Sequence, residues 1–222
     1  MIKVVLFDLD GTLLNRDASL LNFIEQQYVR FNSNLNHIKK EKYISRFIEL
    51  DSRGYVWKDK VFTQLINEYN LTDVTMNELL DDYISQFKHH CVPFDHLITM
   101  LKDLKNKSYH LGIISNGRGK FQLDNIKALG IDQFFDCILI SETEGVSKPN
   151  PEIFKKAIDY FDVLPEECVF IGDHPKNDYF GAKNVGMSVI WKKDLQWGDF
   201  EPAYSIDDLS DIISILDKIA SE

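Results

Sequence analysis

Two carboxylates, Asp8 and Asp10, follow the apolar run Met1–Phe7 in the string DLDGT. Side chains two residues apart on an extended backbone project to the same side, so both acids face one ligand before Gly11 lets the chain turn. Two carboxylates about 4 Å apart repel each other by roughly 4 kcal/mol at an effective dielectric of about 20. A lone pair of this kind is typical of a solvated turn, so its meaning depends on the groups that join it.

Other polar groups follow other apolar runs. Ser115 and Asn116 come directly after one run, Asp173 after another, and Lys148 shortly after a third. Taken singly, these residues are explained as well by a helix cap, a strand-end turn and a surface lysine. If the runs are parallel strands, their carboxyl ends meet at the edge where α/β proteins bind ligands. We therefore expect these four residues to join the two carboxylates there.

The acidic residues of this set require a cation. Asp8, Asp10 and Asp173 offer only oxygen ligands, which favours Mg²⁺, an ion that keeps several waters and commonly shares its shell with a substrate phosphate. Zinc is not favoured, because the histidines are isolated or, like His89 and His90, adjacent and unable to share a helix face. The predicted cofactor is therefore Mg²⁺.

With a cation bound, these residues predict phosphoryl chemistry. Asp8 is a candidate nucleophile that forms a covalent intermediate on phosphorus, which water then hydrolyses. Asp10 is the available acid and base, protonating the leaving oxygen and then activating the water. Ser115 and Asn116 are candidates for hydrogen bonds, and Lys148 for a charge, to the phosphoryl oxygens.

The elements that must position these residues follow from the apolar pattern. Five candidate strands are bounded by turn residues: Ile2–Phe7, His110–Ile114, Cys137–Ile140, Cys168–Ile171 and Met187–Trp191. Between them, helical spacing marks Phe121–Leu129 and Pro151–Phe161, the latter with Asn150 as its N-cap. This alternation predicts an α/β fold with a doubly wound, Rossmann-like parallel sheet.

One long stretch interrupts the alternation with helical patterns and no strand. Helical spacing recurs in Leu20–Phe31, Tyr43–Leu50 and Val61–Tyr69. Thr75 with Glu78 three residues later is a capping box for a further helix. We therefore expect an α/β hydrolase core of residues 1–15 and 92–222 and an inserted helical cap of residues 16–91.

Composition narrows the function classes. The 222-residue chain has a formal net charge of −10 and no dense basic cluster, which argues against nucleic acid as a partner. No apolar run predicts a membrane span or a signal segment. The cysteines Cys91, Cys137 and Cys168 fit neither a disulfide framework nor a metal site. We expect a soluble cytoplasmic protein that acts on a small phosphorylated substrate, with its oligomeric state open.

The ordered motifs resemble those of a known family. DLDGT, Ser115 with Asn116, Lys148 before a proline, and Asp173 with Asp178 are similar in order and spacing to the four motifs of the haloacid dehalogenase-like hydrolase superfamily. The resemblance covers residues 1–14 and about 93–215 and is to subfamily I phosphatases that carry a helical, C1-type cap.

The resemblance implies a role for each motif residue. Asp8 would carry an aspartyl-phosphate, Asp10 would be acid, base and a backbone metal ligand, and Ser115 and Lys148 would bind phosphate. Asp178 would orient a metal-bound water or the motif lysine. The implied magnesium site comprises Asp8, Asp10, Asp173 and Asp178.

Two features lie beside these motifs. Leu50–Trp57, with Gly54 as hinge, is our candidate for the cap loop that reaches the site in such enzymes. Arg53 on it is a candidate for a substrate anion, with an exposed cap arginine as the common alternative. His174, next to Asp173, either touches the leaving group or, as is more usual, is hydrogen-bonded within its own loop.

Three alternatives stay open. A phosphotransferase such as a sugar-phosphate mutase uses the same intermediate. A 2-haloacid dehalogenase attacks carbon without a metal, although that branch typically replaces the second acid, retained here as Asp10. A non-catalytic binding protein would keep the fold, although no motif is broken. Among substrates, nucleotide, sugar and glycolate-type phosphates are all open.

Overall fold

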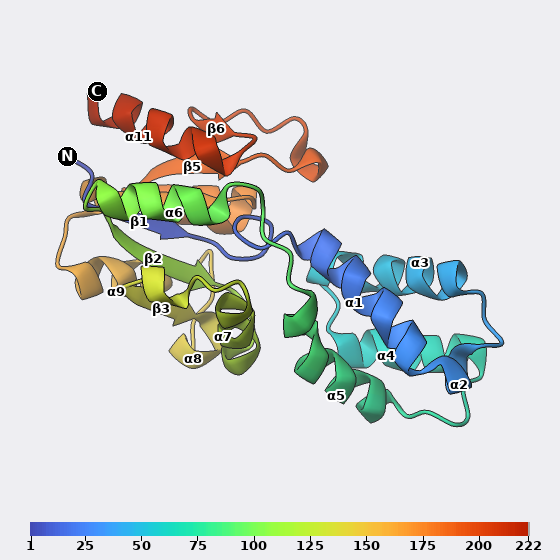
Figure 1. The fold of residues 1–222 in the computed structure, drawn as a ribbon. Helices are drawn as coiled ribbons and strands as arrows, with labels where there is room; N and C mark the ends of the chain where they lie inside the picture. Colours follow the sequence, from blue (N-terminus) through green and yellow to red (C-terminus); the bar gives the residue numbers. More distant parts are fainter. Residues whose placement is uncertain (222) are drawn as a thin grey trace. The chain divides into compact units, whose positions relative to one another are not determined.

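The computed structural model describes residues 1–221, and these divide into two compact units. The core unit comprises Met1–Asn15 and the described chain from Pro93 onward, and the helical unit comprises Arg16–Val92. Figure 1 shows strands flanked by helices in the core unit and helices alone in the helical unit. None of the described helices combines the length and the apolar composition that crossing a bilayer requires.

The core unit is built on a six-stranded sheet with the strand order β3-β2-β1-β4-β5-β6, and every neighbouring pair is parallel. The strands are β1 (Val4–Phe7), β2 (His110–Ser115), β3 (Cys137–Ile140), β4 (Cys168–Gly172), β5 (Ser188–Lys192) and β6 (Ser205–Ile206). The side chains of β1 are buried throughout, as expected for a strand covered on both faces. The predicted α/β fold with a parallel, Rossmann-like sheet is confirmed, and β6 adds a strand to it.

Helices flank this sheet (Figure 1), where α6 packs with α11 and α9 packs with α10. The α-helices of the core unit are α6 (Leu97–Asn106), α7 (Gly119–Ala128), α8 (Ser141–Glu144), α9 (Pro151–Phe161), α10 (Gly181–Lys183) and α11 (Ile212–Ser221). Its shorter turns are η3 (Asp132–Phe134), η4 (Pro165–Glu167), the π-helical η5 (Pro175–Phe180), η6 (Leu195–Trp197) and η7 (Leu209–Asp211).

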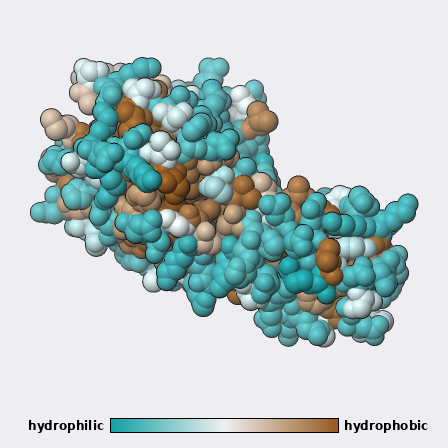
Figure 2. All heavy atoms as spheres, viewed as in Figure 1, coloured by the Kyte–Doolittle hydropathy of each residue, from teal (hydrophilic) through white to brown (hydrophobic). Residues whose placement is uncertain are grey.

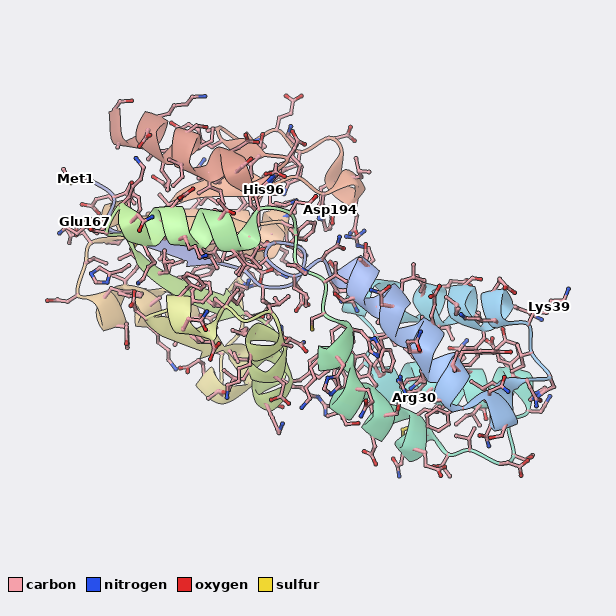
Figure 3. The ribbon with its side chains drawn as sticks, viewed as in Figure 1. Met1, Arg30, Lys39, His96, Glu167 and Asp194 are labelled. Atoms are coloured by element: carbon pink, nitrogen blue, oxygen red, sulfur yellow. The ribbon has the colours of Figure 1, made fainter. Side chains whose placement is uncertain are left out.

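The two ends of the sheet are distinct. Figure 3 labels Met1 and Glu167 at the amino end of the strands, and His96 and Asp194 at the carboxyl end of the same unit. At the amino end, Nζ of Lys3 pairs with Glu167 at 2.6 Å. The motif residues follow the strands, so they emerge at the opposite, carboxyl end of the sheet.

The observed α9 matches the predicted helix Pro151–Phe161, and its N-cap is the predicted Asn150, whose side chain accepts a hydrogen bond from the backbone N–H of Glu152 at 3.0 Å. The first N–H groups of a helix have no carbonyl partner within that helix. Proline lacks an N–H group, so a proline at the first helical position favours a helix start at this point. The helix holds one end of the loop that carries Lys148.

The helical unit contains α1 (Arg16–Arg30), α2 (Asn32–Leu35), α3 (Lys40–Asp51), η1 (Ser52–Gly54), α4 (Lys58–Tyr69), α5 (Met76–Gln86) and η2 (Phe87–His90). Aromatic rings form much of its interior; Phe23 meets Tyr83 edge-on with centroids 5.2 Å apart. The unit therefore has a hydrophobic core of its own.

The predicted capping box of α5 is present, since Thr75 Oγ1 accepts from the N–H of Glu78 while the Glu78 carboxylate accepts from the N–H of Thr75.

On the face shown in Figure 2, most of the visible atoms belong to hydrophilic residues. Cys137 and Cys168 are buried free thiols, as expected, whereas Cys91 is only partly buried.

Candidate active site at the carboxyl edge of the sheet

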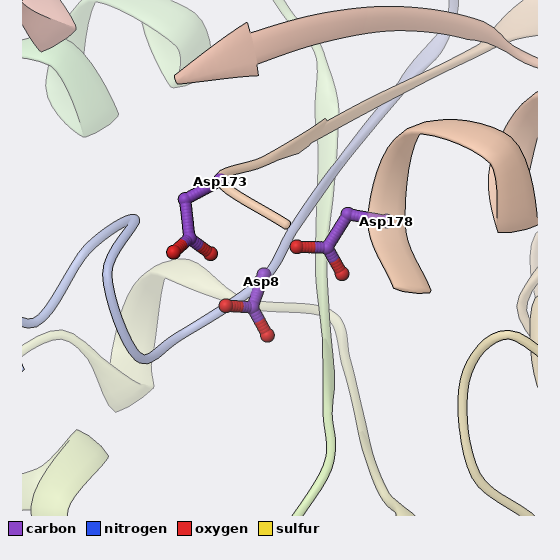
Figure 4. Close-up of side chains that lie close together, drawn as sticks. All are labelled: Asp8, Asp173 and Asp178. Atoms are coloured by element: carbon purple, nitrogen blue, oxygen red, sulfur yellow. The ribbon is translucent and has the colours of Figure 1, made fainter. Parts of the chain in front are cut away.

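Three carboxylates meet at the carboxyl end of the central strands. Asp8 follows β1, Asp173 follows β4, and Asp178 lies in η5. The parallel register pairs Phe7 with Ile171, so the residues that follow these strands emerge together. One oxygen from each carboxylate lies within 4.8 Å of the other two, and Figure 4 shows the three side chains close together. The structure thus brings together three of the four residues predicted to surround a metal.

Lys148 supplies the positive charge beside this group. Its Nζ donates to Oδ1 of Asp8 at 2.6 Å and to Oδ1 of Asp178 at 2.7 Å, and its side chain is almost fully buried. Burial alone would lower the pKa of Lys148, but the two carboxylates outweigh it and raise that pKa above its usual value. Lys148 is therefore charged at neutral pH.

The negative charge of the three carboxylates exceeds the positive charge of Lys148. Burial raises the pKa of Asp8, Lys148 lowers it, and the carboxylates of Asp178 and Asp10 raise it; together they bring this pKa to about 7. Burial, Asp178 and Asp8 likewise raise the pKa of Asp173 well above its usual value. Three carboxylates thus face one ammonium group, and a hard divalent cation with oxygen ligands fits both the charge and the donor set.

Gly11, in the turn after β1, lies against the carboxylate of Asp173. Gly11 has a φ of +86°, and a Cβ atom added there would lie 2.4 Å from Oδ2 of Asp173. A side chain at this position would therefore displace the carboxylate as well as strain the backbone. This close approach explains the glycine of the DLDGT string.

Asn116 braces the lysine loop. Its amide group donates to the backbone oxygen of Lys148 and accepts from the backbone N–H of the same residue, both at 2.9 Å. These bonds fix where Lys148 leaves the backbone. The predicted direct contact of Asn116 with phosphate stays a prediction.

The Asp10 side chain lies apart from the three-carboxylate group and is held by a residue that sequence reasoning missed. Nε2 of Gln122, in α7, donates to Oδ2 of Asp10 at 2.6 Å and to Oγ of Ser115 at 2.7 Å. The available signal was a polar residue on the buried face of α7, where Gln122 and Asn125 precede the buried Ile126 at helical spacing. Which partners such residues meet depends on the tertiary fold.

His174 is hydrogen-bonded within its own loop, the more usual of the two arrangements considered from the sequence. Its Nδ1 accepts from the backbone N–H groups of Lys176 and Asn177 at 3.1 and 3.3 Å, and its ring packs on Trp197. In turn, the N–H of His174 donates to Oδ2 of Asp178 at 3.0 Å. The histidine thereby orders the π-helical turn that carries Asp178.

In the helical unit, the candidate loop has an unusual backbone. Ser52, Arg53 and Gly54 all have positive φ, at 46°, 55° and 90°. The buried Asp51 holds this turn by accepting from the N–H of Gly54 at 2.9 Å, and it is itself bonded by Arg16 and Lys58. Arg53 pairs with Asp17 at 3.6 Å, and its contact with a substrate anion stays a prediction.

Comparisons with known proteins identify the family to which this chain is similar. The sequence profile of the family described as haloacid dehalogenase-like hydrolase matches residues 5–192. A glyceraldehyde 3-phosphate phosphatase from Pyrococcus furiosus is 32% identical, with 98% of this chain and 94% of that protein covered. The pyrophosphatase PpaX from Bacillus mycoides is 28% identical, with 98% of each covered. The crystal structure of a HAD phosphatase from Thermococcus onnurineus, 30% identical, superimposes with a TM-score of 0.68 over 97% of this chain and 98% of that one.

Proposed function

The chain belongs to the haloacid dehalogenase-like hydrolase family, and from this membership we propose that it is a magnesium-dependent phosphatase of small phosphorylated metabolites. The observation that carries the proposal is the pairing of Asp8 with Lys148 at 2.6 Å inside a group of three carboxylates. This arrangement supplies a nucleophile, a positive charge for a phosphate group, and ligands for a hard cation in one place.

The proposed reaction has two halves, both centred on Asp8. Oδ1 of Asp8 is held by Lys148, which leaves Oδ2 to bond to phosphorus while the bond from phosphorus to the leaving oxygen breaks. Asp10 gives its proton to that oxygen. Water then bonds to phosphorus, its proton passes to Asp10, and the bond between phosphorus and Oδ2 breaks to release inorganic phosphate.

The residues around Asp8 would bind the phosphoryl group. Two of the three hydrogens of Lys148 Nζ go to Asp8 and Asp178, which leaves one for a phosphoryl oxygen. Ser115 lies at the end of β2 and offers its hydroxyl from the neighbouring strand. Such donors stabilise the charge of the transition state most where water is excluded.

The proposed cofactor is Mg²⁺. Asp8, Asp173 and Asp178 would hold it, together with the backbone of Asp10, because they form a buried, all-oxygen set with excess negative charge. When bound, Mg²⁺ would neutralise charge on the phosphate and on the carboxylates that surround it.

For the substrate we propose only a broad class. The two named relatives differ in substrate, glyceraldehyde 3-phosphate for one and, by its name, pyrophosphate for the other. What they share is release of phosphate from a small compound, and that is what we propose for this chain. That residues 16–91 act as a cap over the site, and that the protein is cytoplasmic, stay predictions.

The test is phosphate release from a panel of triose, sugar and glycolate phosphates, nucleotides and pyrophosphate, with magnesium or excess chelator. We expect Asp8→Asn to lose the magnesium-dependent release. Asp103→Asn, on the exposed face of α6, is the matched control and should behave as the wild type. Chelator-insensitive chloride release from a 2-haloacid would instead favour a dehalogenase, and transfer to a sugar hydroxyl would favour a mutase.

A further inference from the structure

Gln122 is the buried residue that links Asp10 to Ser115. It lies in α7 with 2% of its surface exposed. Its Nε2 donates to Oδ2 of Asp10 at 2.6 Å and to Oγ of Ser115 at 2.7 Å. Two residues from the ends of neighbouring strands are therefore tied together through one amide group of a helix.

The orientation of this amide is fixed on both sides. A glutamine amide has two N–H hydrogens, and here each has one acceptor. The opposite atom, Oε1, accepts from Nδ2 of Asn125 one turn later in the helix, at 3.4 Å. Since Oε1 accepts from Asn125, the nitrogen is the atom that faces Asp10.

These bonds constrain the chemistry of both partners. Because the Ser115 oxygen accepts from Gln122, the hydroxyl hydrogen must point to another acceptor, and a phosphoryl oxygen is the one the reaction brings. Because Oδ2 of Asp10 is held, Oδ1 is the oxygen left to exchange a proton with the leaving group.

The turn after β2 leaves just enough room for this side chain. A Cβ atom added to Gly117 would lie 2.9 Å from Cγ of Gln122, closer than real Cβ contacts allow. A glycine at position 117 is therefore needed for Gln122 to reach both acceptors.

We propose that Gln122 is a positioning residue that selects Oδ1 of Asp10 for proton transfer and turns the Ser115 hydroxyl toward the phosphoryl group. This inference rests on the proposed function. It adds a role for α7, which contributes none of the residues predicted from the motifs.

The sharpest variants are Gln122→Met, which removes the donor, and Gln122→Glu, which keeps the shape but replaces the donor with an acceptor facing Asp10. We expect kcat to fall about 100-fold in Gln122→Met, as for a misplaced catalytic group, and further in Gln122→Glu. The dissociation constant for inorganic phosphate, titrated calorimetrically with magnesium present, should rise about tenfold in Gln122→Met, the share of roughly one hydrogen bond.

The chain offers a matched control in Gln27. This residue is also fully buried, and its Nε2 also donates to a carboxylate, Asp82 at 2.9 Å, but in the helical unit. Gln27→Met should lower thermal stability about as much as Gln122→Met while leaving kcat within twofold of the wild type. Equal kcat values for the two variants would reduce Gln122 to a structural role and overturn the proposal.

Two further measurements keep the test decisive. If Gln122→Met does not fold, Gly117→Ala should produce the same losses by displacing Gln122. In a Ser115→Ala background, Gln122→Met should weaken phosphate binding no further, because the two act together. A wild type that binds phosphate but is inactive on every substrate would refute the phosphatase assignment, while an unchanged phosphate affinity in Gln122→Met would refute the role of Gln122.

Discussion

Asp8 carries the proposed chemistry and also destabilises the metal-free protein. Its carboxylate is buried near Asp178 and Asp10, and it pairs with the ammonium group of Lys148 at 2.6 Å. Active sites commonly keep such unfavourable charge because catalysis needs it, and removing it increases stability at the expense of activity. The pKa of about 7 makes this effect measurable across an accessible pH range.

We therefore expect Asp8→Asn to stabilise the protein in excess chelator at pH 8. Folding raises the pKa of Asp8 from 3.8 to about 7, so the folded state binds the proton more tightly. Stability from this group is full below the lower value and is lost as pH rises through the higher one. The gain should be about 1–3 kcal/mol at pH 8 and smaller at pH 5.

Thermal unfolding of wild type and Asp8→Asn at both pH values checks this expectation. Asp103→Asn, on the exposed face of α6, controls for the general effect of losing one negative charge. A lower melting temperature for Asp8→Asn at pH 8 would mean that its ion pair with Lys148 outweighs the burial of charge.

At the scale of the elements, the strands were predictable and some helices were not. β1 and β4 are buried throughout and β2 and β5 nearly so, which produces continuous apolar runs that are visible in the sequence. β6 has only two residues, too few for any periodicity. α6 starts after His96, a residue in the left-handed conformation whose side chain makes no cap bond, so the usual signal for a helix start is missing.

Some residues of the candidate site were likewise predictable from the sequence, and others were not. Asp8, Lys148 and Asp173 each follow a strand of a parallel sheet, and the carboxyl ends of such strands meet at one edge, so the sequence alone predicts that these residues lie together. Gln122 obeys no such rule. Its contact with Asp10 depends on how α7 packs beside the end of β1, and packing between distant segments is not encoded in local spacing.

The capping box of α5 offers a test of a signal that lies in the local sequence. Thr75→Ala removes the capping box in which Thr75 and Glu78 satisfy each other's backbone N–H groups. The loss should be about 1 kcal/mol, or roughly 2–4 °C in melting temperature for a chain of this size. Ser85→Ala, exposed on the same helix, should change the melting temperature much less; equal shifts for the two variants would refute the cap argument.

At the scale of the whole molecule, the described chain separates the chemistry from the helical insertion. All the candidate metal and phosphate ligands lie in the core unit, while the helical unit has its own aromatic interior and its own buried Asp51 network. The substrate could not be predicted, because the residues of the helical unit match no substrate-specific motif, and a contact of Arg53 with substrate stays a prediction.

This division predicts where magnesium acts. Hydrogen exchange measured with magnesium and with chelator should show slower exchange in peptides that contain Asp8 and the turn Asp173–Asp178, and no change in peptides of residues 16–92. Asp173→Asn should lose the difference. Protection that appears only in the helical unit would place the cation elsewhere.

The position of β1 also has a consequence for biosynthesis. β1 pairs with β2 from His110 and with β4 from Cys168, so its partners lie far along the chain. At roughly 5–20 residues per second of translation, the first strand waits on the order of 5–20 seconds for its nearest partner. During that interval the whole helical unit, Arg16–Val92, is synthesised. We therefore expect the apolar residues of β1 to stay unpaired until β2 has been made, an interval in which the nascent strand is exposed to other binding partners in the cell.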